Sequence, residues 1–318
     1  MTVENVAEMT LRIRAELAKV IVGQATVIEE AIACLLSDGH VLLEGAPGLA
    51  KTLLARSIGY CFQFETARIQ FTPDLMPSDI VGSTVYHADT GEFRVRKGPI
   101  FANLLLADEI NRTPPKTQAA LLEAMEERKA TIDGVAYPMP DPFIVLATQN
   151  PIEYEGTYPL PEAQVDRFLM KIVIDYPAKA EEEAILQKRH SGFRPQKLEE
   201  AGLVPVSNGQ GLAEARAAVD SVAIDPAIVS YIVDLARRTR VHERAMVGAS
   251  PRASIALLSS AKAFAAMRGS PFVIPDDVKR AAPAVLRHRL ILRPEAEIEG
   301  ATPDAVTLAV LEAAPVPR

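Results

Sequence analysis

A turn rich in glycine and proline constrains the fold of this chain more than any other feature of its sequence. The turn reads Gly45-Ala46-Pro47-Gly48-Leu49-Ala50-Lys51-Thr52. A short β-like run at 41–43 precedes it and an apolar-periodic segment at 51–62 follows it, so we expect a strand, a loop and a helix in succession. Backbone N–H groups of such a loop, together with the N-terminus of the helix, form a cradle for phosphate groups. The sequence therefore predicts a phosphate-binding loop.

The loop departs at one position from the phosphate-loop pattern. Ala50 stands where the pattern has its second glycine. An alanine fits there only if its backbone stays in a region open to residues with a Cβ. Within the pattern, Lys51 would reach the terminal phosphates of a nucleotide and Thr52 would hold Mg²⁺. A plain turn between a strand and a helix is the alternative interpretation.

A second motif ends another apolar strand in two acids. The run 104–107 is entirely apolar, and Asp108 and Glu109 follow it. In a parallel sheet this strand end would lie beside the phosphate loop. Asp108 would then act on Mg²⁺ through its water shell, and Glu109 would polarise the attacking water. The alternative is the start of a helix, where acidic side chains are favourable.

Three further polar residues are candidates for the same site. Asn150 follows an apolar strand, and an amide there could hydrogen-bond the attacking water and the γ-phosphate. A turn before Pro151 is the alternative. Arg167 and Arg252 lie near expected helix termini, where a single arginine is more often a solvated or salt-bridged surface residue than a catalytic one.

Short β-like runs alternate with helical segments over the first half of the chain. That order is typical of an α/β fold with a largely parallel sheet covered by helices on both faces. We expect strands at 41–43, 68–71, 101–107, 143–147 and 171–174, and helices at 6–21, 25–38, 51–62 and 114–127. Two polar insertions, at 83–97 and 128–138, alternate about a turn-forming pair as β-hairpins do.

Strand signals cease after Pro177, and amphipathic helical stretches follow. They lie near 180–190, 211–220, 226–240, 251–268 and 275–288, with an irregular connector at 191–209. At 318 residues the chain is longer than most single domains. We therefore expect an α/β domain at 1–176 and a smaller all-α domain at 177–318.

Composition limits the partners of such a protein. The formal net charge of −7 disfavours non-specific attraction to nucleic acid and to anionic membranes, although a local basic patch is compatible with it. No apolar run approaches the roughly 18–20 residues of a membrane span. Glu4 and Glu8 do not fit the basic-then-apolar order of a signal peptide. We expect a cytoplasmic protein that does not enter a membrane.

Together these motifs resemble those of the AAA+ ATPases and, within that class, the MoxR family. The resemblance covers nearly the whole chain. Its most specific stretches are 43–52, 70–80, 108–118 and 160–168. Alanine at position 50 is itself common in that family. The resemblance implies an AAA+ P-loop NTPase core followed by a smaller helical lid.

The resemblance also implies roles for the residues around the phosphate loop. Lys51 and Thr52, with the loop from Gly45, match the Walker A motif. Asp108 and Glu109 match Walker B, and Asn150 resembles sensor 1.

Outside that loop, two arginines and a short segment match the family. Arg167 resembles the finger that completes a neighbouring subunit's site, and Arg252 resembles sensor 2 on the helical lid. The segment 21–24, with Val22 and Gln24, resembles the one that packs around adenine, although its Gly-Gln pair could equally be a turn between two helices. The hairpins resemble the helix-2 insertion and the pre-sensor hairpin, which face the central pore in related rings.

By this resemblance the chain is an ATPase that uses ATP and Mg²⁺ to remodel, mature or load cofactor into client proteins, as a chaperone does. It would act as a homo-oligomeric ring, usually of six subunits, with a partner that carries a von Willebrand factor A domain. A chelatase-type or DNA-directed motor is the alternative, because such motors use the same insertions. A scaffold that binds ATP without turnover is a third reading. Glu109 argues against it, since a binding module has no use for a carboxylate that activates water.

Overall fold

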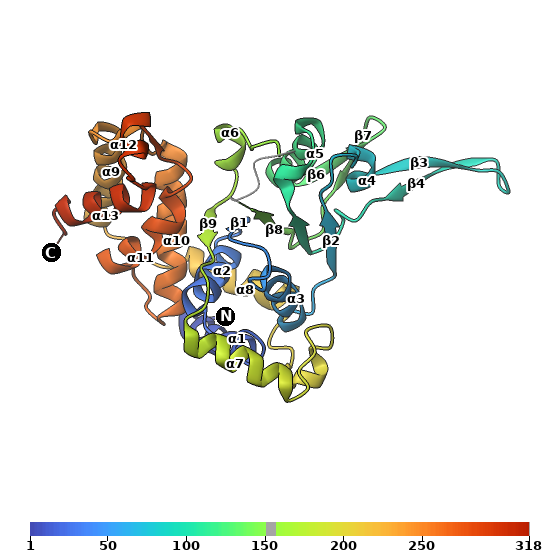
Figure 1. Cartoon of the computed structure of the whole chain (residues 1–318), viewed down its shortest axis with the longest axis horizontal. Helices are drawn as coiled ribbons and strands as arrows, with labels where there is room; N and C mark the ends of the chain where they lie inside the picture. The colour runs from blue at the N-terminus through green and yellow to red at the C-terminus, as the bar shows by residue number, and fades with distance from the viewer. Residues whose placement is uncertain (151–156, 318) are drawn as a thin grey trace.

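A five-stranded, all-parallel sheet lies at the centre of the computed structural model, which describes residues 1–150 and 157–317 (Figure 1). Its order is β2-β5-β8-β1-β9. The strands are β1 (Val41–Glu44), β2 (Thr66–Gln70), β5 (Leu104–Asp108), β8 (Ile144–Gln149) and β9 (Met170–Val173). Because β1 pairs with both β8 and β9, the loop that follows β1 lies at the carboxyl edge of the sheet, where α/β proteins bind ligands. The expected α/β fold with a parallel sheet is confirmed.

Each face of the sheet packs against its own hydrophobic core. Successive side chains of a strand point to opposite faces, so Leu43 and Leu106 join one core while Leu42 and Leu105 join the other. The first core includes residues of α1 (Val3–Ala18), α2 (Ala25–Leu36) and α3 (Lys51–Cys61). The second includes residues of α4 (Pro77–Val81) and α5 (Pro115–Glu127). Burial of both faces explains why the inner strands β1, β5 and β8 read as apolar runs.

Both insertions form β-hairpins, as the alternation of their residues predicts. β3 (Gly82–His87) pairs with β4 (Glu92–Lys97), and β6 (Lys129–Ile132) pairs with β7 (Val135–Pro138). The β3–β4 hairpin projects away from the rest of the molecule (Figure 1). On it, the exposed Tyr86 and Phe93 rings lie with their centroids 5.1 Å apart.

The second half of the chain is mainly helical. Its longer helices are α7 (Lys179–His190), α8 (Gly209–Asp220), α9 (Pro226–Val241), α10 (Pro251–Met267), α11 (Pro275–Leu286) and α13 (Pro303–Ala313). Shorter elements here are α6 (Glu162–Val165), η2 (Glu199–Ala201) and α12 (Pro294–Ile298), and η1 (Ile110–Arg112) follows β5 in the first half. Among the described residues, no helix is both long and apolar enough to cross a membrane.

The expectation that strands cease after Pro177 is wrong. β10 (Ala245–Val247) pairs with β11 (Ile291–Leu292) as a small antiparallel ladder. Strands this short show too few residues to reveal an alternating pattern. The domain boundary expected near 177 stays a prediction, and α10 packs against α1 and α2 as well as against α9 and α11.

Candidate functional site

A pocket of about 630 Å³ opens between the phosphate loop and α7. Loop residues, the two acids, Asn150 and the segment after α1 all line it. The candidates that meet there are Val22, Gln24, Pro47, Gly48, Leu49, Ala50, Lys51, Thr52, Asp108, Glu109 and Asn150. Two loop candidates, Gly45 and Ala46, are buried and do not line the pocket.

The phosphate loop places Lys51 at the start of α3. Its Nζ donates to the carbonyl oxygen of Gly45 at 2.7 Å, which folds the side chain back over the loop. Ala50 precedes the helix with φ 59° and ψ 18°, in the left-handed region. That region is small and costs a residue with a Cβ energy. The backbone of Ala50 therefore lies in a region that a residue with a Cβ can adopt, but only at a cost. The same conformation explains why the phosphate-loop pattern has glycine at this position.

Asp108 is held by a cation and a hydroxyl. Arg68 donates to Oδ2 from Nη2 at 2.7 Å and from Nε at 3.2 Å. Thr148 donates its hydroxyl to Oδ1 at 2.6 Å and accepts the backbone N–H of Glu109 at 2.8 Å. Thr148, at the end of β8, therefore fixes both acids at the end of β5.

The Glu109 side chain is oriented from the end of β2. Gln70 donates from Nε2 to Oε2 at 2.7 Å, and Arg112 donates from Nη1 to the same oxygen at 3.1 Å. Glu109 itself has φ 57° and precedes the short η1 turn. A helix start, the alternative from the sequence, is thus partly present, but the side chain of Glu109 lines the pocket.

Asn150 is 6% exposed and follows β8 directly. It reaches the same pocket as Glu109, as expected for a residue that contacts the attacking water or a phosphate. Pro151, the turn residue of the alternative interpretation, lies outside the described residues.

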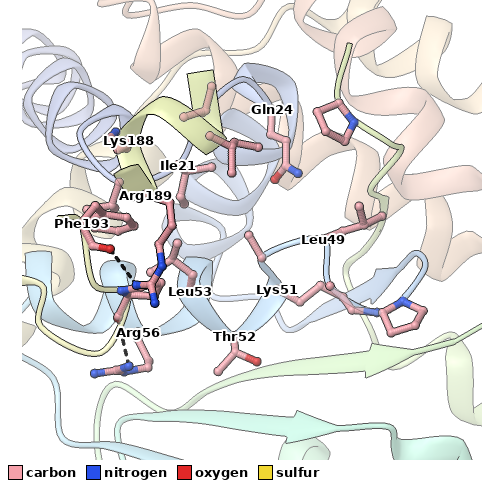
Figure 2. Close-up of a pocket in the computed structure, with 18 of the residues that line it drawn as sticks. Ile21, Gln24, Leu49, Lys51, Thr52, Leu53, Arg56, Lys188, Arg189 and Phe193 are labelled. Carbon is pink, nitrogen blue, oxygen red and sulfur yellow. Dashed lines mark hydrogen bonds between the residues drawn. The ribbon is translucent and has the colours of Figure 1, made fainter. Parts of the chain in front are cut away.

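The far wall of the pocket comes from α7 and the connector after it (Figure 2). Arg56 of α3 donates to the carbonyl oxygens of Pro195 and Gln196 at 3.2 and 3.0 Å. Arg189 donates to the carbonyl oxygen of Phe193 at 2.9 Å. The sequence predicts only an irregular connector here. The sequence does not reveal that this connector lines the pocket, because the bonds from Arg56 join it to a helix far away in the chain.

The segment after α1 is both a turn and part of the pocket wall. Gly23 and Gln24 have φ values of 68° and 55°, and Gln24 precedes α2. The positive φ of Gly23 favours glycine, because side chains with a Cβ rarely adopt this conformation. Val22 and Gln24 line the pocket. The turn between two helices is therefore confirmed, while packing around adenine stays a prediction that the position of Val22 and Gln24 in the pocket wall allows.

Arg167 and Arg252 do not line this pocket. Both pair with Glu126 near the end of α5, Arg167 through Nη2 at 2.8 Å and Arg252 through Nη2 at 3.0 Å. They line a separate, smaller pocket of about 280 Å³ that also includes Asp166 and Arg289. We call these five residues the arginine surface. The sequence offers no signal for Glu126, one of several acids on a helix.

Arg289 hydrogen-bonds the backbone on both sides of Arg167. It donates five hydrogen bonds at 2.6–3.1 Å, as many as a guanidinium has N–H groups. The acceptors are a side-chain oxygen of Asp166 and the carbonyl oxygens of Asp166, Phe168, Leu169 and Val285. Its side chain is 3% exposed, and burial lowers its pKa below the usual value.

Two buried histidines support the same surface from behind. His40 accepts the N–H of Val145 on Nδ1 at 3.0 Å, so Nε2 carries the proton and lies 3.3 Å from the carbonyl oxygen of Met125. His288 Nε2 lies 3.0 Å from the carbonyl oxygen of Phe168. Burial lowers the pKa of His40 to about 3 and that of His288 well below its usual value. Both rings are therefore neutral at pH 7, and each bonds the backbone next to Glu126 or Arg167.

Two family models match the chain. The model of the ATPase family associated with various cellular activities (AAA) matches residues 40–170, and the model of the AAA lid domain matches residues 237–309. The crystal structure of a candidate ATPase from Cytophaga hutchinsonii superposes with a TM-score of 0.90 at 40% identity and covers 99% of this chain and 96% of that chain. A parallel sheet with a phosphate loop, followed by a lid, is the architecture of the AAA+ ATPase class.

Named relatives narrow that class. The chain is 45% identical to Chaperone MoxR1 of Mycobacterium tuberculosis, over 95% of this chain and 81% of the relative. It is 32% identical to Protein MoxR of Methylorubrum extorquens, over 96% and 94%. It is also 46% identical to the uncharacterized protein YeaC of Bacillus subtilis, over 94% and 92%. The chain belongs to the MoxR family of AAA+ ATPases.

Proposed function

We propose that this chain hydrolyses ATP to ADP and phosphate as one subunit of a homo-oligomeric ring, with six subunits as the expected number. One observation carries the proposal. The residues suited to bind nucleotide and activate water line one pocket, whereas Arg167 and Arg252 line another. A site that uses all of them needs two copies of the chain.

Within the pocket, each group has a step that its chemistry suits. Backbone N–H groups of the loop and the Nζ of Lys51 bind the phosphates. The Thr52 hydroxyl and the Asp108 carboxylate both line the pocket, and oxygen atoms of these kinds are the ligands that Mg²⁺ prefers. Arg68 and Thr148 hold the Asp108 carboxylate in a fixed orientation, which favours this role. When bound, Mg²⁺ neutralises charge on the β- and γ-phosphate oxygens.

Glu109 activates the attacking water. Its carboxylate accepts a proton from the attacking water while the Asn150 amide orients that water against the γ-phosphate. Gln70 keeps the Glu109 side chain directed from the end of β2. Arg167 and Arg252 of the neighbouring subunit then donate hydrogen bonds to the phosphate oxygens as charge develops.

The work that hydrolysis drives is the remodelling, maturation or cofactor loading of client proteins, in a cytoplasmic protein with a von Willebrand factor A domain partner. The naming of one relative as a chaperone supports this reading. So does the projecting β3–β4 hairpin, where Phe93 is 73% exposed, because apolar side chains on a projecting loop suit contact with other proteins.

The test is the rate of hydrolysis per subunit as a function of subunit concentration, with assembly followed by light scattering. The rate per subunit should rise with assembly, stop when EDTA removes Mg²⁺, and stay low at every concentration for Glu109→Gln. A rate per subunit that is the same for monomers and assemblies would contradict the ring. Hydrolysis stimulated by DNA, with salt-dependent DNA binding, would favour the DNA-directed alternative.

A further inference from the structure

Glu126 bridges the two arginines through its two carboxylate oxygens. Oε2 lies 2.8 Å from Nη2 of Arg167, and Oε1 lies 3.0 Å from Nη2 of Arg252. The three side chains come from different parts of the chain: α5, the turn after α6, and the first turn of α10. All are partly exposed, at 37% for Glu126, 29% for Arg167 and 48% for Arg252. One carboxylate thus brings two distant cations together at an open surface.

This arrangement suits the binding of one anion by both arginines. Two guanidinium groups side by side repel each other, and a carboxylate between them offsets that repulsion. Each guanidinium has five N–H donors, so a bond to Glu126 leaves donors for an incoming phosphate. A phosphate oxygen pair then meets two cations whose positions are already set.

The backing of the three residues is rigid. Arg289 holds the backbone on both sides of Arg167, and its Nε donates to Oδ1 of Asp166 at 2.6 Å. The other Asp166 oxygen lies 3.9 Å from Nη1 of Arg252. His40 lies against the carbonyl oxygen of the residue before Glu126. The bridge therefore rests on fixed groups, which is what preorganised charge stabilisation needs.

We propose that Glu126 is a positioning residue that holds Arg167 and Arg252 as one pair for the phosphate bound by the neighbouring subunit. The inference rests on the proposed function, since it assumes hydrolysis between subunits. It assigns to an acidic residue, outside the nucleotide pocket, a part in setting the rate. The opposite role, a lock that competes with phosphate for the arginines, predicts an effect of opposite sign.

The experiment compares Glu126→Gln with Glu127→Gln. Glu127 is the adjacent acid on α5, and it pairs with Lys129 at 3.5 Å instead of with either arginine, so it is a matched control. Glu126→Gln should lower kcat roughly 10- to 100-fold, as expected when a reacting group loses its position. KM for ATP should change less than about threefold, because Glu126 lies outside the nucleotide pocket. Glu127→Gln should resemble the wild type in both.

A second arm tests whether Glu126 acts through the arginines. In an Arg252→Ala background only one arginine remains to be held, so the fold loss from Glu126→Gln should shrink. Thermal unfolding of every variant checks the fold. The same fold loss in both backgrounds would overturn the proposal even if Glu126→Gln lowers stability. An unchanged or raised kcat in Glu126→Gln would overturn it as well.

Different results would contradict the proposed hydrolysis and the positioning role of Glu126. If the assembled wild-type protein does not hydrolyse ATP, the proposed function is wrong and the positioning role falls with it. If the wild type hydrolyses ATP and Glu126→Gln does so equally well, only the positioning role is wrong.

Discussion

The acidic end of the nucleotide pocket, at Asp108 and Glu109, and the arginine surface have opposite charge arrangements. In the pocket, the acids Asp108 and Glu109 line the cavity, while Arg68 and Arg112 bond them from the side. At the arginine surface the reverse holds: cations line the hollow, and Glu126 bridges them. The acidic end of the pocket is suited to a cation and a water, and the arginine surface is suited to an anion.

The two regions also differ in how complete they are. The pocket is the larger cavity and has walls from the loop, three strand ends and α7. The arginine surface is smaller and holds its cations against carboxylates of its own chain. The difference fits the proposal that one chain supplies nucleotide binding and water activation, whereas its arginine surface acts on a phosphate held by another chain.

The largest effects should come from substitutions in the pocket. Lys51→Ala should weaken ATP binding about 100-fold or more, since a charge-assisted bond to phosphate is lost. Glu109→Gln should bind ATP nearly as well as the wild type and lose about 10²- to 10⁴-fold in turnover, because only proton acceptance is removed. Equilibrium binding and steady-state hydrolysis measure the two. Equal loss of ATP binding in both variants would contradict the separate roles of Lys51 in binding and Glu109 in water activation.

Arg252→Ala should lower the rate of hydrolysis without changing ATP binding. Arg252 is outside the pocket of its own chain, so unassembled subunits should bind ATP with unchanged affinity. Turnover of the assembled protein should fall roughly 10²-fold, the cost of one lost donor to developing charge. The matched control is Arg244→Ala, an exposed arginine of the same half of the chain. Weaker ATP binding by unassembled Arg252→Ala subunits would contradict this prediction, because it would show that Arg252 contacts the nucleotide of its own chain.

Acid should destabilise the fold through the two buried histidines behind the arginine surface. The folded-state pKa of His40 is about 3 and that of His288 is well below its usual value, whereas both titrate near 6.5 when unfolded. Below pH 6.5 the unfolded chain therefore binds protons that the folded chain does not, and stability falls as pH falls. The loss approaches about 1.4 kcal/mol per histidine at pH 5.5 and continues toward the folded pKa.

Urea unfolding at pH 7.5 and 5.5 measures this loss. His288→Gln should show a smaller difference between the two pH values than the wild type, and the exposed His190→Gln should not. A difference that is the same in all three proteins would show that other groups cause the acid sensitivity.

The smallest effect concerns the backbone of the phosphate loop. Ala50→Gly should relieve a left-handed alanine, worth about 1 kcal/mol, but glycine also gains freedom in the unfolded chain, worth about 0.4–1 kcal/mol. The net should be a gain in unfolding free energy of a few tenths of a kcal/mol. Ala55→Gly, inside α3, should instead cost about 1 kcal/mol. Chemical denaturation measures the free energy of unfolding of both variants. A clear decrease for Ala50→Gly would contradict the strain at Ala50.

The sequence predicts the central sheet well. Strands that are buried on both faces consist of apolar residues, and such runs are recognisable in the sequence. The strand end at Asp108 and Glu109 is predicted from such a run, and the phosphate loop from its glycines and proline between a strand and a helix. The pair β10–β11 was missed because two or three residues carry no period.

What the sequence does not predict are contacts between distant residues. Arg68 reaches Asp108 only because β2 and β5 are neighbours, and Glu126 meets Arg252 only because α5 and α10 approach each other. Neither residue differs locally from any other charged residue on a strand or a helix. The resemblance to a family suggests a role for Arg252, but the carboxylate that holds it comes from the structure alone.

Mixed assemblies test directly whether the arginine surface of one subunit completes the pocket of the next. Arg167→Ala leaves the pocket intact, and Glu109→Gln leaves the arginine surface intact, so each should be nearly inactive alone. The loss for Arg167→Ala should be on the order of 10³-fold or more. In mixtures shown to co-assemble, some interfaces pair an intact Glu109 with an intact Arg167. Hydrolysis should then partly return, and no recovery in such mixtures would contradict the account and pass the finger role to another arginine such as Arg112.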